Sequence, residues 1–273
     1  MTSSVDVIIV NHNTRDELRA CLASLLRDRP ASLKRVFVVD NASTDGSAAA
    51  VRSGWPDVDV IPLDRNAGFA AANNVALRQA TAPLVLLLNS DTIVTAAAID
   101  RLVERLLATQ ATAAGPRLVD EAGYPEVSFG SMLAPASELV QAIRVRLSRS
   151  RGTLASRYIR GLVSRERDAD WVSGACLLVW RDAALAVGGL DERYFLYEED
   201  VDFCAALRAR GGRILFTPHA AITHLRGRAR AAAGHGTAHY DRSHLAFYDK
   251  HLPRWAPLLR RWLRLRGRGS PDA

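Results

Sequence analysis

Short apolar runs that alternate with helical patterns are the feature that most constrains the fold of this chain. The runs at residues 5–10, 35–39, 58–63 and 84–88 are apolar and partly β-branched, and each precedes a helix-like stretch. Repeated β-α units with short connections predict an α/β fold with a mostly parallel, doubly wound central sheet flanked by helices. The 273 residues suffice for one large domain or two small ones, and one domain with an appended tail is the simpler interpretation.

Local signals refine the expected elements. Thr14 and Glu17 have the spacing of a capping box at the start of the first helix. Ser43 or Thr44 is expected to cap the helix after the second strand. The expected helices cover residues 14–29, 66–80, 93–107 and 198–210, and the later strands cover 171–180, 213–216 and 220–224.

Polar side chains follow each of the four early strands at its carboxyl end. Ligands of doubly wound sheets bind beyond the carboxyl ends of the strands, so four such clusters predict a polar binding site at this edge. The residues are Asn11 and Asn13, Asp40 and Asn41, Asp64 and Asn66, and Asn89 and Asp91.

The segment after the second strand is a candidate nucleotide site. The chain has neither GxGxxG after its first strand nor GxxxxGK[ST], which excludes these two phosphate-binding motifs. The Asp40 carboxylate can accept hydrogen bonds from a base N–H or a ribose hydroxyl. The alternative is a turn in which Ser43 and Asp45 cap the next helix.

Asp91 ends the fourth strand and is a candidate ligand for Mg²⁺ or Mn²⁺, which favour oxygen ligands shared with phosphates. The alternative is that Asp91 caps the following helix. His224, at the end of a late strand, is on residue type alone a structural or surface histidine.

Four carboxylates occupy five positions between residues 198 and 202. Such crowding raises at least one pKa unless cations or hydrogen bonds offset it. A solvated helix start and a general base in a polar cleft are the two interpretations of this cluster.

The net charge of +7 is unevenly distributed. Residues 141–167 carry eight Arg and one Glu, and residues 251–269 carry six Arg and no acid, which leaves the remainder at −6. The first segment lacks a recognition motif and interleaved aromatic residues, so nucleic acid is not an expected partner. Beyond an expected helix at 137–147 its periodicity is weak, and we interpret it as an insertion or mobile segment.

The second basic segment predicts an amphipathic helix at residues 253–266. A cationic amphipathic helix with Trp is typical of a peripheral membrane anchor, and a helix docked on the domain or in a homodimer contact is the alternative. Its apolar stripe comprises Trp255, Leu258, Leu259, Trp262 and Leu265, and Arg254, Arg261, Arg264 and Arg268 fall mainly on other faces.

Compartment signals favour the cytoplasm, with peripheral contact at the inner face of the cell membrane. The three cysteines form no CxxC pair and do not indicate a disulfide framework. The longest apolar run, residues 83–88, is too short to span a bilayer. The first strand begins too early to leave room for a signal peptide.

Six segments in order resemble glycosyltransferase family 2, the inverting enzymes with the GT-A nucleotide-diphospho-sugar transferase fold, and in particular its bacterial rhamnosyltransferase-type branch. The resemblance covers about residues 5–250. The segments are VIIVNHNT (7–14), VVDNASTDGS (38–47), RNAGFAAANN (65–74), LLLNSDT (86–92), WVSGACLLVWR (171–181) and GGLDERYFLYEEDVDFCAALRARG (188–211).

The resemblance implies a role for each matched residue. Asn89-Ser90-Asp91 occupies the DxD position with Asn in place of the first Asp, so Asp91 becomes the main metal carboxylate, and His224 matches a metal ligand of some relatives. Asp200 is implied as the catalytic base, with Glu199 as the alternate. Nucleotide and donor binding falls to Asn11, Asn13, Thr14, Asp40, Asn41, Ser43, Asp45, Asn66, Gly68, Asn74, Asn89, Ser90 and Asp91, and the acceptor and sugar pocket to Trp171, Ser173, Gly174 and Ala175.

The implied activity is a single displacement that moves L-rhamnose from dTDP-rhamnose to a hydroxyl of a glycan or lipid-linked acceptor, with Mg²⁺ or Mn²⁺, in polysaccharide or cell-wall biosynthesis. Alternatives are a UDP donor of galactofuranose, glucose or N-acetylglucosamine, and a non-catalytic binding protein on a degenerate GT-A fold. The implied organisation is a nucleotide-binding half at residues 1–115, an acceptor and catalytic half at 116–250 with the Arg-rich insertion, and a basic tail at 251–273.

Overall fold

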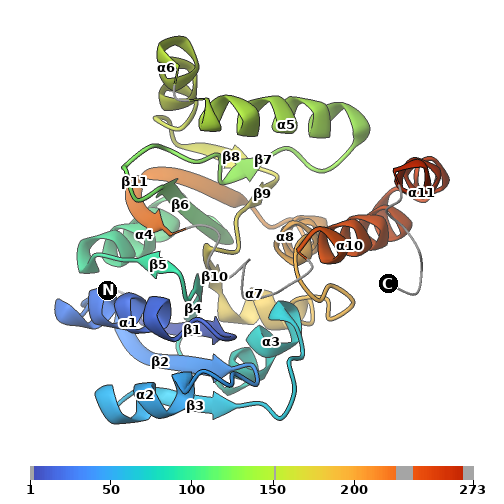
Figure 1. The fold of residues 1–273 in the computed structure, drawn as a ribbon. Helices are drawn as coiled ribbons and strands as arrows, with labels where there is room; N and C mark the ends of the chain where they lie inside the picture. Colours follow the sequence, from blue (N-terminus) through green and yellow to red (C-terminus); the bar gives the residue numbers. More distant parts are fainter. Residues whose placement is uncertain (1–2, 151, 226–235, 267–273) are drawn as a thin grey trace.

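The computed structural model describes residues 3–150, 152–225 and 236–266 and has an α/β architecture built around one mixed sheet (Figure 1). The sheet order is β3-β2-β1-β4-β10-β6-β11-β5, with β8 paired to β11, and β7 and β9 form a separate two-stranded sheet. The strands are β1 (Val5–Asn11), β2 (Leu33–Asp40), β3 (Asp59–Pro62), β4 (Leu84–Asn89), β5 (Thr92–Ile93), β6 (Ala113–Val119), β7 (Phe129–Gly130), β8 (Arg167–Ala169), β9 (Trp171–Val172), β10 (Cys176–Trp180) and β11 (Ile214–His224).

The register of the first four main strands brings their polar ends together. β1 pairs in parallel with β2 and β4, and Asn11 lies opposite Asp40 while Val10 lies opposite Asn89. β10 then inserts antiparallel between β4 and β6. The prediction of a parallel sheet is therefore confirmed for β1–β4, and the sheet becomes mixed beyond β4.

Ten helices lie in the described part of the chain, and they cover both faces of the sheet (Figure 1). Helices α1, α2 and α4 contribute to one hydrophobic cluster, and α3, α7 and α8 contribute to another. The helices are α1 (Arg15–Arg27), α2 (Ser47–Gly54), α3 (Phe69–Gln79), α4 (Ala96–Thr109), α5 (Pro135–Arg149), α6 (Thr153–Leu162), α7 (Arg181–Ala186), α8 (Glu199–Ala209), α10 (Gly236–His251) and α11 (Ala256–Leu265).

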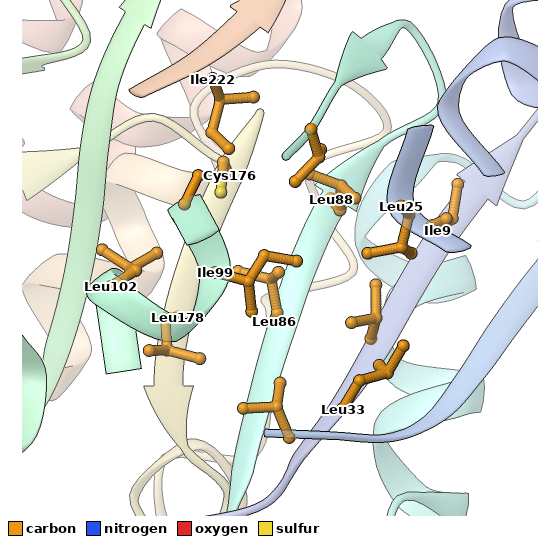
Figure 2. Packing of buried hydrophobic residues seen from close by; sticks show 14 of the residues in the cluster. Ile9, Leu25, Leu33, Leu86, Leu88, Ile99, Leu102, Cys176, Leu178 and Ile222 are labelled. Atoms are coloured by element: carbon orange, nitrogen blue, oxygen red, sulfur yellow. The ribbon is translucent and has the colours of Figure 1, made fainter. Parts of the chain in front are cut away.

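Strand periodicity explains the two clusters. Val7 and Ile9 point to one face of β1, and Ile8 points to the other, because successive side chains of a strand alternate. Figure 2 shows Ile9 beside Leu25 of α1 on the first face. Burial on both faces accounts for the nearly continuous apolar runs that the sequence shows.

Thr14 is the N-cap residue of α1, as the sequence predicted, but its hydroxyl does not make the expected cap bond, and the prediction for the cap of α2 is wrong. The Thr14 hydroxyl donates to Asn11 Oδ1 at 2.7 Å and makes no cap bond at α1. At α2 it is Asp45 that accepts the Ser47 N–H, at 3.0 Å, so neither Ser43 nor Thr44 is the cap.

Several predicted boundaries also need correction. Residue 93 belongs to β5, and α4 begins after Thr95, which excludes Asp91 as its cap. Residues 171–180 form β9 and β10 with a turn between them. The two strands expected at 213–224 are one strand, β11, with a register shift between Thr217 and Ala221.

The Arg-rich segment folds into α5 and α6, although the sequence indicated an irregular insertion. Ile159 and Val163 are buried in the cluster beneath α3 and α8, with Leu147 and Leu162 packed against it. Burial of these four side chains explains why a segment with weak overall periodicity is helical.

A third cluster connects α10 and α11 to the rest of the molecule. It is formed by Tyr194, Val201, Phe247, Tyr248 and Ala256. Helix α11 lies within the segment 253–266 that the sequence indicated, and residues 267–273, with Arg268, lie outside the described residues. None of the helices within the described ranges has the length and apolar character needed to cross a membrane.

Candidate active site

A cavity of about 660 Å³ opens at the carboxyl ends of β1, β2 and β4. It lies at the edge where the sequence predicted a polar site. The predicted residues that line it are Thr14, Asn41, Asn66, Gly68, Asn89, Ser90, Asp91, Ser173 and His224, and those that lie outside its lining are Asn11, Asn13, Asp40, Ser43, Asp45, Asn74, Trp171, Gly174, Ala175, Glu199 and Asp200.

The loop after β1 is held to its neighbours by a network of neutral hydrogen bonds. Asn11 Nδ2 donates to Ser43 Oγ at 3.1 Å, and Ser43 Oγ also accepts the Asn13 N–H at 3.0 Å. Ser90 Oγ lies 2.9 Å from Thr14 Oγ1. These bonds join the ends of β1, β2 and β4, so the cavity wall is assembled before any ligand arrives.

A second part of the network positions the loop before α3. Asn41 Nδ2 donates to Asn66 Oδ1 at 2.8 Å, and Asn41 Oδ1 accepts the Ala67 N–H at 2.8 Å. Gly68 has φ +86, and a Cβ there would lie 2.6 Å from Phe195 O. Only glycine combines this backbone conformation with so close an approach to the loop that precedes α8.

Three of the predicted residues outside the cavity lining form hydrogen bonds with backbone groups or with buried side chains. Asn74 donates to Leu190 O at 2.8 Å and accepts the Leu190 N–H at 2.9 Å, so its amide fixes the loop before α8. Asp45 accepts the Arg15 N–H at 2.8 Å at the start of α1. Asp40 is buried at the end of β2, 3.5 Å from Asn11 Nδ2.

Asp91 and His224 meet on one wall of the cavity. Asp91 Oδ1 lies 3.3 Å from His224 Nε2, and His224 Nδ1 lies 3.5 Å from Glu126 Oε2. Burial lowers the pKa of His224, but hydrogen bonds to Asp91 and Glu126 outweigh it and raise the pKa to about 9. The carboxylate and imidazole are side by side although they are far apart in the sequence, because β11 pairs with β5 next to Asp91.

One turn links this wall to the acidic pair of α8. The Asn89 N–H donates to Ala175 O at 3.0 Å, and the Gly174 N–H donates to Asp200 Oδ2 at 2.7 Å. A Cβ at residue 174 would lie 3.2 Å from Asp200 Cβ, so glycine lets the turn approach the carboxylate. Ser173, one residue earlier, lines the cavity, which places Asp200 directly behind its wall.

The four acids at the start of α8 differ in how their charge is balanced. Helix α10 supplies cations to two of them: Asp202 Oδ1 lies 2.8 Å from Lys250 Nζ, and Glu198 Oε1 lies 3.1 Å from His244 Nδ1. Across the described residues, Glu199 and Asp200 form no ion pair with a Lys, Arg or His side chain.

Burial is the main cause of the raised pKa values of Glu199 and Asp200. Burial raises the pKa of Asp200 to about 6, with a further contribution from the charge of Glu198, while the hydrogen bond from Gly174 opposes the rise. Burial and the charge of Asp200 raise the pKa of Glu199 well above its ordinary value. Asp200 is partly exposed whereas Glu199 is buried, so Asp200 is the more accessible proton acceptor.

His244 holds a buried junction between three helices. Its Nε2 lies 3.2 Å from Glu138 Oε2 of α5, and its Nδ1 faces Glu198 at α8, so both ring nitrogens face carboxylates. Burial lowers the pKa of His244, but the hydrogen bonds to Glu138 and Glu198 raise it to about 9. Tyr248 also donates to Glu138.

The sequence prediction missed several residues that line the cavity. His12 donates from Nδ1 to Asn41 O at 2.8 Å, and its position inside the motif of residues 7–14 is the signal that could have identified it. Asp120, Tyr124 and Glu126 come from the irregular connection between β6 and β7, where no periodic pattern marks them.

Trp171, predicted in the acceptor pocket, lies outside the cavity lining. Its Nε1 donates to Ser131 O at 2.9 Å, and its ring packs against Gly130, where a Cβ would come within 2.6 Å. The residue therefore fixes the connection between β7 and α5.

Solved structures with the same fold are glycosyltransferases. The chain superimposes on GalNAc-T7 with UDP, GalNAc and Mn²⁺ at a TM-score of 0.61 and 17% identity, over 82% of this chain and 43% of that one. It superimposes on the mannosyltransferase PcManGT from Pyrobaculum calidifontis, in complex with GDP-Man and Mn²⁺, at a TM-score of 0.60 and 19% identity, over 95% and 68%.

The sheet order, the polar cavity at the strand ends and these neighbours define a glycosyltransferase with the GT-A fold. Residues 6–159 match the Glycosyl transferase family 2 profile. The chain is 34% identical to the N-acetylglucosaminyl-diphospho-decaprenol L-rhamnosyltransferase of Mycobacterium tuberculosis, over 98% of this chain and 91% of that protein. It is 27% identical to the O-antigen biosynthesis protein RfbC of Myxococcus xanthus, over 90% and 19%. The chain belongs to glycosyltransferase family 2, whose members are inverting enzymes.

Proposed function

We propose that this enzyme transfers L-rhamnose from dTDP-rhamnose to a hydroxyl of a lipid-linked acceptor that ends in N-acetylglucosaminyl diphosphate. The observation that carries the proposal is the 34% identity, over nearly the full length of both chains, to a rhamnosyltransferase of that acceptor class. The preassembled polar cavity, next to an unneutralised acidic pair, supplies the chemistry such a transfer requires. Transfer of galactofuranose, glucose or N-acetylglucosamine from a UDP donor is the alternative within the same reaction class.

The donor nucleotide is proposed to bind the wall formed by the ends of β1 and β2. Asn41, Asn66 and His12 present amide and imidazole groups at that wall, with Asp40 behind it as the base-binding carboxylate. The hydrogen bonds among these residues keep them in place without a ligand, which reduces the ordering cost of binding. This assignment makes residues 1–115 the donor half and 116–250 the acceptor half, with 251–273 as the tail.

Asp91 and His224 fit a divalent cation. Asp91 Oδ1 is buried and lies 3.3 Å from Nε2 of His224, so a carboxylate oxygen and an imidazole nitrogen meet at one point of the cavity wall. In the described ranges no group of three His, Cys, Asp or Glu side chains is arranged to hold a metal, so two protein ligands are what the chain offers. Donor phosphates commonly complete such sites, and Mg²⁺ and Mn²⁺ both accept oxygen ligands. The bound cation supplies neutralisation of the charge on the departing diphosphate.

The proposed base is Asp200. Its carboxylate takes the proton of the acceptor hydroxyl while that oxygen attacks the anomeric carbon from the face opposite the diphosphate. The bond to the diphosphate breaks, and the sugar is delivered with inverted configuration. The Gly174 N–H, at 2.7 Å, and the Val201 N–H, at 2.9 Å, orient the carboxylate for this role. A pKa of about 6 keeps the group ionised at neutral pH and still basic enough to accept a proton.

The tail helix is proposed to contact the membrane that carries the acceptor. Trp255, Leu258, Trp262 and Leu265 are exposed on α11, whereas Ala256 and Leu263 are buried against the protein. The exposed stripe with flanking arginines fits a peripheral anchor on the cytoplasmic face. A homodimer through the same stripe is the alternative.

A donor panel tests the proposed function. Thermal shift is measured with dTDP, UDP and their sugars, with and without Mg²⁺ or Mn²⁺, and transfer is measured with N-acetylglucosaminyl diphosphate carrying a short lipid. We expect dTDP-rhamnose to raise the apparent Tm, since a ligand of the folded state stabilises it by mass action. Turnover with inverted product is then expected with dTDP-rhamnose alone.

Two other outcomes of the donor panel would change the proposed function. Turnover only with a UDP-sugar replaces rhamnose by the alternative donor. Donor binding without transfer to any acceptor indicates the non-catalytic binding protein.

A further inference from the structure

Helix α5 turns apolar side chains toward the solvent, which is the reverse of an ordinary amphipathic surface helix. A surface helix normally turns its apolar stripe to the core and its charged face to water. On α5, Leu139 is 64% exposed, Val140 and Ile143 are also exposed, and the helix has no buried residue. A contiguous exposed apolar face of this kind marks an interaction surface.

The opposite side of α5 faces the rest of the protein and carries polar side chains together with the partly buried Leu147. Ser148 lines the active-site cavity. Gln141 Nε2 donates to Phe129 O at 3.3 Å, and Glu138 contacts Tyr248 and His244. The polar side chains of α5 therefore contact the rest of the protein, and these hydrogen bonds fix the orientation of the helix.

Exposed leucines also occur on α6 and α11. On α6, Leu154 is 83% exposed, and on α11, Leu265 is 80% exposed. The start of α5 and the helix α11 meet at one cluster, because Met132 and Leu259 both pack against it. Figure 1 shows the end of α5 that follows β7 directed toward α10 and α11.

The two segments that carry these exposed apolar side chains are rich in arginine. Residues 135–162 contain six Arg and a single acid, Glu138, which is turned inward to His244 and Tyr248. Residues 252–266 contain five Arg and no acid. An apolar stripe bordered by arginines is complementary to a bilayer with anionic headgroups, in which apolar groups enter the acyl boundary and cations meet phosphates.

We propose that α5, together with the exposed stripe of α11, is the surface that docks this enzyme on an anionic membrane. The helix that contacts the bilayer with one face then lines the cavity with the other. A lipid-linked diphosphate acceptor reaches the cavity along α5 without leaving the membrane surface. This last step rests on the proposed function, whereas the docking itself does not.

The test uses the full chain and sedimentation with vesicles, without any substrate. Vesicles contain phosphatidylcholine with or without phosphatidylglycerol. The variant is Leu139→Ser/Val140→Ser/Ile143→Ser, and the matched control is Leu185→Ser, an exposed leucine on α7. Full burial of one such apolar side chain changes an equilibrium constant by roughly tenfold or more. We therefore expect the triple variant to bind phosphatidylglycerol vesicles roughly tenfold or more weakly, and the control to bind like the wild type.

Three results would overturn the docking surface. They are wild-type protein that stays in the supernatant, a triple variant that binds as well as wild type, and a wild-type dimer that the triple substitution dissociates without vesicle binding. Because these side chains are exposed, the variant is expected to keep the wild-type Tm. A second variant, Leu258→Ser/Leu265→Ser on α11, is expected to weaken binding as well.

Activity separates docking from the proposed function. The triple variant is expected to keep wild-type transfer to a short, water-soluble acceptor and to lose transfer to a long-chain acceptor in vesicles. A wild-type enzyme that binds vesicles but transfers to neither acceptor would refute the proposed function and leave the docking surface standing.

Discussion

The two sides of the cavity hold their polar groups in opposite ways. On the donor side, amides and hydroxyls satisfy one another: Asn11 with Ser43, and Asn41 with Asn66. On the catalytic side, acids crowd the start of α8, and α10 neutralises only the first and the last of them.

The contrast separates binding from reactivity. A network of satisfied neutral hydrogen bonds holds its side chains in place, which suits recognition of a fixed ligand. Glu199 and Asp200 form no ion pair with a Lys, Arg or His side chain in the described part of the chain, and desolvation raises their pKa and makes a carboxylate a better proton acceptor. The unfavourable electrostatic energy thus lies at Asp200 and Glu199 and not at the proposed donor wall.

The largest expected effect comes from removing the reactive carboxylate. Asp200→Asn preserves the shape of the side chain but removes the proton acceptor, so kcat should fall by about 10²–10⁴-fold. Donor affinity, measured by thermal shift, should stay at the wild-type value. Asp182→Asn, an exposed carboxylate on α7, is the control and should retain full activity. Near-normal turnover of the Asp200 variant would remove Asp200 from its role.

The pH dependence of kcat/KM is a second test of Asp200 as the proposed base. The base acts only when ionised, so kcat/KM should be constant above a pH of about 6 and fall about tenfold per unit below it. The profile is measured by initial rates between pH 4.5 and 8, with the stability of the enzyme checked at each pH. A flat profile through pH 6 would contradict the raised pKa.

The ion pair between His244 and Glu198 predicts an effect of intermediate size on the free energy of unfolding. The pKa of His244 is raised in the folded state to about 9 from an ordinary value of 6.5. The stabilisation it provides is complete below pH 6.5 and is lost as pH rises through about 9, and it amounts to at most about 3 kcal/mol. His244→Gln should therefore lower the free energy of unfolding at pH 6 and differ little from wild type at pH 10.

Urea unfolding at the two pH values measures this difference. A variant that is equally destabilised at both would show that His244 acts through packing alone. Because Glu198 adjoins the reactive pair, the same variant should also raise the pKa seen in the rate profile.

The smallest effect is expected on the donor wall. Ser43→Ala removes an acceptor shared by Asn11 and Asn13, and the loss of a neutral hydrogen bond costs about 1 kcal/mol. The donor KM should rise about fivefold with kcat nearly unchanged. A fall in kcat comparable to that of the Asp200 variant would show that the two walls are not separate.

Sequence patterns predicted the features that depend on strand ends. Asn41, Asn89 and Asp91 line the cavity because parallel strands in register bring their carboxyl ends to one edge. The periodic patterns also predicted α1, α3, α4 and α8 to within a few residues.

Other features required the tertiary structure. Thr14 is the N-cap residue of α1 but makes no side-chain cap bond, because its hydroxyl bonds to Asn11 and lies 2.9 Å from Ser90 Oγ at the end of β4. His244 lies 46 residues from Glu198, and no local pattern connects them. Glu126 lies in an irregular connection, where position is set by contacts rather than by periodicity.

Gly68 has a consequence for redesign of the enzyme. It lies against Phe195, whose carbonyl accepts the Phe69 N–H at 2.7 Å, so the donor loop and the loop leading to the acidic pair share one backbone junction. A graft that exchanges residues 65–74 for those of a relative with another sugar preference would reset the approach of the catalytic loop as well. If the proposed roles of the two loops hold, we expect donor preference and catalytic alignment to change together, so that a chimera needs both segments from the same parent.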